Sequence, residues 1–344
     1  MASFDTEFSS GLEDAVFDYF IVGGGTSGLV VADRLSEDPN VRVIVLEAGT
    51  NRLDDPRITI PGLGIATFED PDFVWNFRSI PQGMKYDEKS NGTDGPVNVS
   101  FGDQYMPYHS AWLETFKGLG YPQVEDLING ARIGPFVTPG SIDPVTNTRS
   151  HSGVAYLGPD VQARSNLRVV TGALVEKVVL DQRSQGDQKG FTVSAQREGI
   201  LAAGTTQTPQ ILELSGIGRS SVLQAHGITP IIDHAGVGEN LQDYGIVPLV
   251  YEVADGLPSG DMARDPAVAA AAMAAYQKDG SGPLGMVPFI SAFMPCADLT
   301  QPELEKILLK IEESIKNPET SITHRKQFEV LQGLIKDPEE ATAQ

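Results

Sequence analysis

Three glycines in a fixed spacing constrain this chain more than any other feature of its sequence. Gly23, Gly25 and Gly28 lie between an apolar run at 18–22 and a segment with an apolar helical face. A second run, 41–46, has Arg42 as its one polar residue, as expected of a strand that is buried on both faces. Strand, glycine turn, helix and strand in this order predict a βαβ unit and a parallel sheet.

Each glycine of this turn has a separate role in a dinucleotide site. The first permits a tight turn, the second lets a pyrophosphate approach the backbone, and the third lets helix and strand pack closely. The helix N-terminus adds unpaired amides that favour an anion. Glu47 ends the second strand, nineteen residues after Gly28, where its carboxylate can accept hydrogen bonds from an adenosine ribose. NAD and FAD fit this pattern equally well, and a glycine turn without a ligand is the structural alternative.

Charge and the apolar pattern exclude several classes of partner. The chain has 25 basic and 46 acidic residues, a formal net charge of −21, and such a mean field repels phosphate. We therefore expect no nucleic acid and no anionic membrane surface as partner. The most apolar stretch, 268–276, is far shorter than the ~20 residues that a bilayer requires. No basic, apolar leader is evident at the N-terminus, so we expect a cytoplasmic protein.

The residues that commonly bind metals or act as nucleophiles are sparse. Cys296 is the single cysteine, which excludes an intramolecular disulfide and a cysteine-based zinc site, and a buried, inert thiol is expected there. No histidine pair has a metal-ligand spacing, so no metal site is predicted. The five histidines are His109, His151, His226, His234 and His324.

Three stretches resemble the glucose–methanol–choline (GMC) oxidoreductases, which are FAD enzymes. The first is 18–30 (DYFIVGGGTSGLV) together with 45–49 (VLEAG), and the second is 203–218 (AGTTQTPQILELSGIG). The third is 236–243 (GVGENLQD), after which the family usually has His and this chain has Tyr244. The likeness runs with gaps from about residue 17 to the last residue and is of the fungal type.

This resemblance implies FAD as the cofactor and assigns residues to it. Those expected to cradle the pyrophosphate are Gly23, Gly25, Thr26, Ser27 and Gly28. Those expected further along the dinucleotide are Glu47 with Ala48 at the ribose, Val175 at the adenine through its backbone amide and carbonyl, and Gly204 with Thr205 where the chain returns to the cofactor.

The resemblance also implies a reaction: an alcohol gives a hydride to the flavin while a histidine takes the hydroxyl proton. The substrate would be a small-molecule alcohol or an intermediate of a fungal secondary-metabolite (polyketide) pathway.

Two departures from the family pattern leave another function open. Residue 82 runs directly into residue 83 where the family has a flavin-covering loop, and the family's catalytic histidine region is absent. The alternative is a catalytically impaired or non-redox shortened relative, either a pseudoenzyme or an FAD-scaffolded cyclase, and no catalytic residue is assigned.

The predicted fold is α/β, a Rossmann-type FAD-binding domain with an incomplete α+β substrate domain. We place the FAD-binding domain at 17–82 plus 147–245 and the incomplete substrate or cap domain at 83–146 plus 246–344.

Shorter signals predict further elements. Residues 167–180 are expected to form two strands in succession, and residues 208–215 a helix with Pro209 in its first turn. Two amphipathic helices are expected at 302–316 and 321–336. We expect their apolar stripe to be only partly buried by the rest of this domain. Either the first domain or a second copy of the chain would cover it, so self-association is one of the two expectations. The stripe residues are Leu304, Ile307, Ile311, Phe328 and Leu331.

Overall fold

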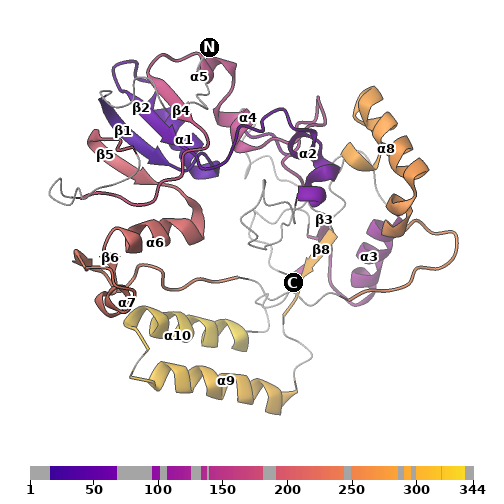
Figure 1. Ribbon diagram of the computed structural model, residues 1–344. Helices are drawn as coiled ribbons and strands as arrows, with labels where there is room; N and C mark the ends of the chain where they lie inside the picture. The colour runs from indigo at the N-terminus through magenta and orange to yellow at the C-terminus, as the bar shows by residue number, and fades with distance from the viewer. Residues whose placement is uncertain are drawn as a thin grey trace. The chain divides into compact units, whose positions relative to one another are not determined.

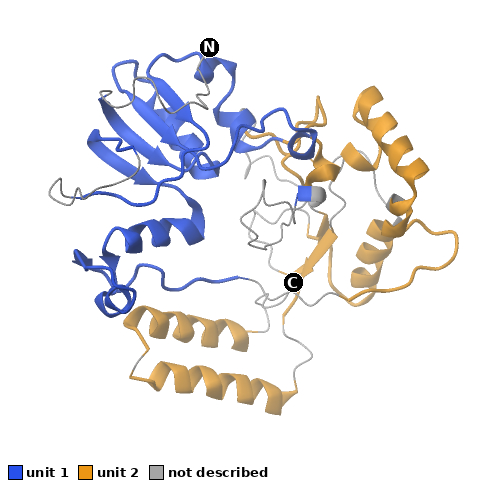
Figure 2. Cartoon of the chain, in the orientation of Figure 1, with its two compact units in different colours: residues 1–59, 66–77, 150–245 blue, residues 60–65, 78–149, 246–344 orange. Residues whose placement is uncertain are grey.

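A computed structural model gives the fold of the chain (Figure 1). It describes residues 16–67, 95–100, 107–124, 133–137, 139–180, 191–243, 249–285, 290–295, 300–318 and 320–337. The chain divides into two compact units (Figure 2). Unit 1 comprises residues 1–59, 66–77 and 150–245, and unit 2 comprises residues 60–65, 78–149 and 246–344. The functional roles predicted for the two domains stay predictions.

A four-stranded parallel sheet forms the centre of unit 1 (Figure 1). Its strands lie in the order β4-β2-β1-β5. Their bounds are β1 Phe17–Val22, β2 Val43–Leu46, β4 Leu167–Val170 and β5 Ala195–Leu201. The chain leaves β1 toward β2 and β4, and returns to the other side of β1 with β5. This arrangement confirms the predicted α/β fold and its parallel sheet, and such a reversal of strand order is where open α/β sheets bind ligands.

Both faces of the sheet are buried. Val43 and Val45 face a cluster with helix α1 (Thr26–Leu35), while Ile44 and Leu46 face a second cluster on the opposite side. All four residues of β2 are buried, which accounts for the apolar sequence of this strand.

Two predicted elements of unit 1 were wrong in part. Of the two strands expected in 167–180, the structure has only β4, because the amides of Gly172 and Ala173 bond to the carbonyls of Gly49 and Glu47 and turn the chain toward the loop after β2. The helix expected at 208–215 is α6, Gly204–Leu214, so that Pro209 lies inside it and not in its first turn. Gly204 has φ +86°, and this conformation allows the helix to begin directly after β5.

Shorter elements complete unit 1 and the segment 60–65, which belongs to unit 2. They are α2 Pro56–Thr59, η1 Pro61–Thr67, α4 Ser152–Tyr156, α5 Pro159–Gln162, β6 Ile217–Gly218, α7 Ser220–Ala225 and β7 Ile232–Asp233.

Unit 2 has a smaller sheet and more helices. An antiparallel pair, β3 and β8, carries Phe136, which packs with Phe293 and Val124. Asp265 caps helix α8 by accepting a hydrogen bond from the Ala267 amide at 2.8 Å. The bounds are α3 Pro107–Gly118, β3 Gly134–Val137, η3 Gly260–Arg264, α8 Pro266–Asp279, η4 Pro283–Gly285 and β8 Ile290–Phe293.

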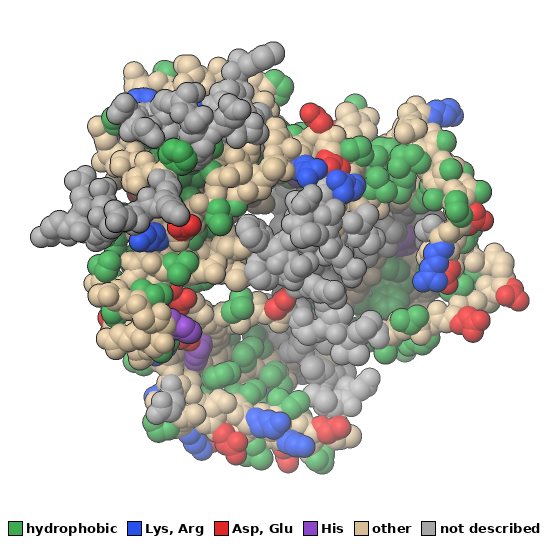
Figure 3. Space-filling view, in the orientation of Figure 1, with side chains coloured by type: hydrophobic (Ala, Val, Ile, Leu, Met, Phe, Trp, Pro, Cys, Tyr) green, Lys and Arg blue, Asp and Glu red, His purple; other side chains and the backbone are tan. Residues whose placement is uncertain are grey.

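The last two helices, α9 (Gln301–Lys316) and α10 (Ile322–Lys336), pack against each other. Neither helix contains a buried residue, and Ile307 and Leu331 are 37% and 41% exposed. Hydrophobic side chains are accordingly visible at the surface over this part of the chain (Figure 3). The incomplete burial of the apolar stripe is therefore confirmed, while its covering stays a prediction.

Candidate functional site

The glycine turn between β1 and α1 contains two kinds of glycine. Gly23 has φ +102°, and a Cβ there would collide with the carbonyl oxygen of Ala202. A Cβ at Gly28 would collide with the carbonyl oxygen of Gly23. At Gly25, in contrast, no heavy atom of the described chain, apart from the two neighbouring residues, lies within 4 Å of the Cβ position. The chain's own packing thus requires the first and third glycines, whereas the space at Gly25 is open.

The N-terminus of α1 faces this open space with unpaired donors. Gly25 is the N-cap residue and supplies no side-chain hydrogen bond, and the first turn contains no acidic residue. Thr26 and Ser27 are exposed beside it. The first-turn amides, the helix dipole and two hydroxyl groups are therefore available to an anion.

Glu47 is fixed at the end of β2 by two backbone amides. Its Oε2 accepts a hydrogen bond from the Gly24 amide at 2.6 Å, and its Oε1 accepts one from the Gly49 amide at 2.7 Å. Each carboxylate oxygen retains a lone pair for another donor. The carboxylate thus lies beside the glycine turn, held in place and still able to accept hydrogen bonds from a sugar.

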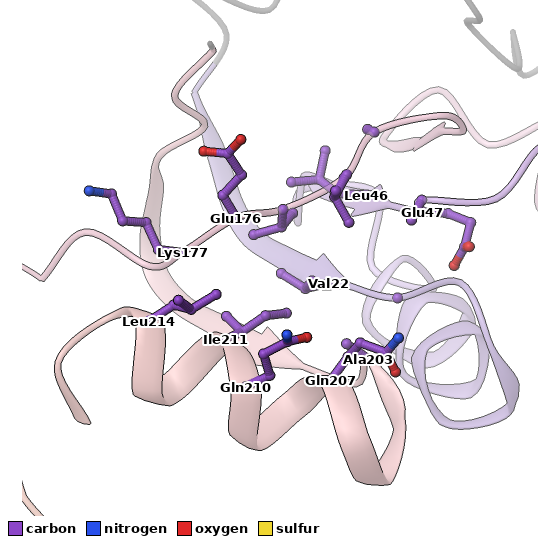
Figure 4. A pocket seen from close by; sticks show the side chains of 15 residues that line it. Val22, Leu46, Glu47, Glu176, Lys177, Ala203, Gln207, Gln210, Ile211 and Leu214 are labelled. Carbon is purple, nitrogen blue, oxygen red and sulfur yellow. The ribbon is translucent and has the colours of Figure 1, made fainter. Parts of the chain in front are cut away.

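A cavity of about 490 Å³ opens next to Glu47 (Figure 4). It lies between the carboxyl ends of β1 and β2, the segment 173–177 and helix α6. Most of its walls are apolar, and the polar groups come from few residues. The lining residues are Val22, Gly23, Leu46, Glu47, Ala48, Ala173, Leu174, Val175, Glu176, Lys177, Ala203, Gln207, Gln210, Ile211 and Leu214.

The cavity brings together several residues that the sequence had singled out. Gly23, Glu47, Ala48 and Val175 all line it. In the part of the chain that the structure describes, neither the amide nor the carbonyl of Val175 has a hydrogen-bond partner. Both backbone groups are thus available to a ligand.

Gly204 and Thr205 do not line the cavity; they lie exposed at the start of α6, next to the lining residue Ala203.

Helix α6 forms a wall of the cavity that was not predicted from the sequence. Its lining residues Gln207, Gln210, Ile211 and Leu214 occupy positions i, i+3, i+4 and i+7, so they share one face of the helix. This periodicity is the signal that could have found them.

The histidines lie elsewhere. His151 caps α4, accepting a hydrogen bond from the Gly153 amide at 3.2 Å, and His226 ends α7. His109 is buried in α3, His324 lies on α10, and none of the five lines the cavity. The junction of residues 82 and 83, Tyr244 and Cys296 fall outside the described residues.

Two other classes of site are absent from the described ranges. These ranges contain no group of three or more His, Cys, Asp or Glu residues arranged to hold a metal ion. Nor do they contain a helix with the length and apolar character needed to cross a membrane.

Comparison with known proteins gives consistent matches. The family model described as GMC oxidoreductase matches residues 71–245, about half of the chain. The dehydrogenase mpl7 of Monascus purpureus is 31% identical, over 86% of this chain and 61% of the relative. A glucose oxidase of Aspergillus carbonarius is also 31% identical, over 67% of this chain and 52% of the relative. The chain thus spans between half and two thirds of the length of these relatives.

A solved structure matches the fold. An FAD-dependent oxidoreductase from Chaetomium thermophilum superposes with a TM-score of 0.74 over 94% of this chain and 71% of that chain. The two sequences are 23% identical, so this likeness concerns the architecture alone.

Proposed function

This chain belongs to the GMC oxidoreductase family, and on that premise we propose that it is an FAD-dependent oxidoreductase that oxidises an alcohol by hydride transfer to the flavin. FAD is the cofactor of the family. The proposed substrate is a small-molecule alcohol or a pathway intermediate, and the similarity to fungal dehydrogenases supports a place in fungal secondary metabolism.

The open space at Gly25 is the observation that carries the proposal. The fold requires glycine at positions 23 and 28, but no atom of the residues that the structure describes occupies the space beside Gly25. Glycine at this position is therefore explained by a ligand that approaches the backbone, and the α1 amides favour a pyrophosphate there. The cavity of about 490 Å³ beside Glu47 is large enough for the nucleoside part of such a ligand.

Different groups of described residues would bind different parts of FAD. The α1 amides with Thr26 and Ser27 bind the pyrophosphate, and Glu47 orients the ribose. The apolar walls of the cavity exclude water around the base. Bound FAD supplies the hydride acceptor, which no side chain can provide.

The base that removes the hydroxyl proton is not assigned to a residue of this cavity. Glu47 is held by two backbone amides, and Glu176 and Lys177 are exposed.

The test is the visible spectrum of the purified chain before and after addition of FAD, followed by gel filtration. Oxidised-flavin bands that stay with the protein, and that an alcohol bleaches under anaerobic conditions, would support the proposal. Retained flavin that no alcohol in a broad panel reduces would favour the alternative, a family member that binds FAD without alcohol oxidation. Failure to retain any flavin would overturn the proposal for this chain.

A further inference from the structure

One side chain of the cavity has no role in the site described above. Gln207 lies on α6, lines the cavity and is half-buried, and its carboxamide lies beside Ala203 (Figure 4). No residue of the described chain forms a hydrogen bond with this carboxamide. Without a partner in the described chain, this carboxamide can form hydrogen bonds only with water or with a ligand in the cavity. Its position in a mostly apolar cavity points to a ligand with a matching polar edge.

Gln210, one turn further along α6, differs in one respect. It also lines the cavity, but it is exposed, so water can satisfy its carboxamide. Ile211 and Leu214 complete this wall with apolar surface. Gln207 is thus the less exposed of the two glutamines that line the cavity.

The order of the groups along the site indicates which part of the ligand lies here. The α1 amides at Gly25 suit the pyrophosphate, and Glu47 beside them suits the ribose. The base attached to that ribose then falls in the cavity, where Val175 and Gln207 come from different walls. The amide and carbonyl of Val175 match N1 and the amino group on the Watson–Crick edge of adenine. A carboxamide matches the other edge, where it accepts from the N6 amino group and donates to N7.

We propose that Gln207 recognises the N6/N7 edge of the adenine ring of FAD and is a specificity-determining residue of this site. This inference rests on the proposed function, because it takes FAD as the ligand. It adds a side-chain contact on α6 to a site otherwise built from backbone amides and one carboxylate. The residue binds the cofactor and takes no part in hydride transfer.

The experiment is a thermodynamic cycle between protein and ligand. The dissociation constants of FAD and of an FAD analogue carrying 7-deazaadenine are measured by isothermal titration calorimetry, with the wild-type chain and with Gln207→Leu. The analogue lacks only the N7 acceptor and keeps the edge that faces Val175. We expect the wild type to bind the analogue about tenfold more weakly than FAD. Gln207→Leu should bind both ligands equally, because the contact that distinguishes them is gone.

Two matched variants serve as controls. Gln210→Leu changes the same chemical group one turn away in the same wall, and Gln224→Leu changes an exposed glutamine on α7. Both should retain the tenfold preference for FAD. Melting temperatures of all variants show whether a loss of binding reflects unfolding.

The outcomes separate this inference from the proposed function. If the wild type binds neither ligand, the proposed function fails and the inference fails with it. If the wild type binds FAD and the analogue equally, FAD binding stands and the assignment of Gln207 is overturned. The assignment is also overturned if the preference persists in Gln207→Leu, or if Gln210→Leu abolishes it.

Discussion

Around Gly23 and Gly28, backbone atoms approach so closely that neither residue has room for a methyl group, whereas α9 and α10 contain no buried residue at all. In the first region, atoms from β1, α1 and the end of β5 determine which residues are tolerated. In the second region, stability comes from local caps and from the contact between two amphipathic helices. The same type of substitution should therefore have different, even opposite, effects in the two regions.

Glycine-to-alanine substitutions should show the largest contrast. Gly28→Ala places a methyl group against the carbonyl oxygen of Gly23, and because both atoms belong to packed backbone we expect a loss of about 3 kcal/mol in the free energy of unfolding. Gly333→Ala lies in α10 with open space around its Cβ position and should stabilise that helix by about 0.5–1 kcal/mol. Urea unfolding followed by circular dichroism measures both. Equal stability of Gly28→Ala and the wild type would contradict the packing described for this turn.

Valine-to-alanine substitutions should show the next largest contrast. Val45 in β2 is 0% exposed, while Val330 in α10 is 62% exposed. Val45→Ala removes two buried methyl groups and should lower the free energy of unfolding by about 2 kcal/mol. Val330→Ala should change it by no more than about 0.5 kcal/mol, because alanine has the higher helix propensity and little burial is lost. Comparable losses in the two variants would mean that another surface covers Val330 on α10.

Elements that are determined by residues close to one another in the sequence could be predicted. The glycine turn, the apolar strand at 41–46 and the Asp265 cap each depend on residues within a few positions of one another. The segment 173–180 could not be predicted in this way, because the amides of Gly172 and Ala173 bond to carbonyls more than a hundred residues earlier in the chain. Its alternating apolar residues are typical of a strand, but those hydrogen bonds determine its path.

Because the start of α6 was predicted wrongly, part of the site was also not predicted. Pro209 favours a helix that begins at residue 208, because proline is well tolerated in a first turn. The helix begins instead at Gly204, whose positive φ is not evident from the sequence. A helix starting at residue 208 excludes Gln207, so the face that lines the cavity could not be recognised. The place of Glu47 beside the glycine turn could be predicted from spacing alone, whereas the role of the Val175 backbone groups is implied only by the family resemblance.

Gly25→Ala tests whether the open side of the glycine turn serves a ligand. Its backbone angles, φ −79° and ψ −163°, are accessible to alanine, and apart from its two neighbours no described residue lies within 4 Å of the added methyl group. We expect a stability change of at most about 1 kcal/mol, since the residue is an N-cap without a side-chain bond. FAD affinity should fall by about tenfold or more, because the methyl group occupies the space of the pyrophosphate. Calorimetric titration with FAD measures the effect, and unchanged affinity would mean that the space is not a phosphate site.

The smallest expected effect concerns the cap of α9 and its dependence on pH. Glu303 Oε2 accepts hydrogen bonds from the Thr300 hydroxyl at 2.6 Å and from the Thr300 amide at 2.9 Å, and these bonds lower the pKa of the carboxyl group. A lowered pKa in the folded state means that the cap stabilises the helix above the ordinary pKa of glutamate and is lost as the pH falls through the lowered value. Hydrogen exchange of the α9 amides, corrected for its intrinsic pH dependence, should therefore show fraying at acidic pH. Glu303→Gln keeps an acceptor that does not titrate, so its first turn should fray less than the wild type at low pH. Equal fraying of the two chains would mean that packing against α10, and not the cap, determines the order of this helix end.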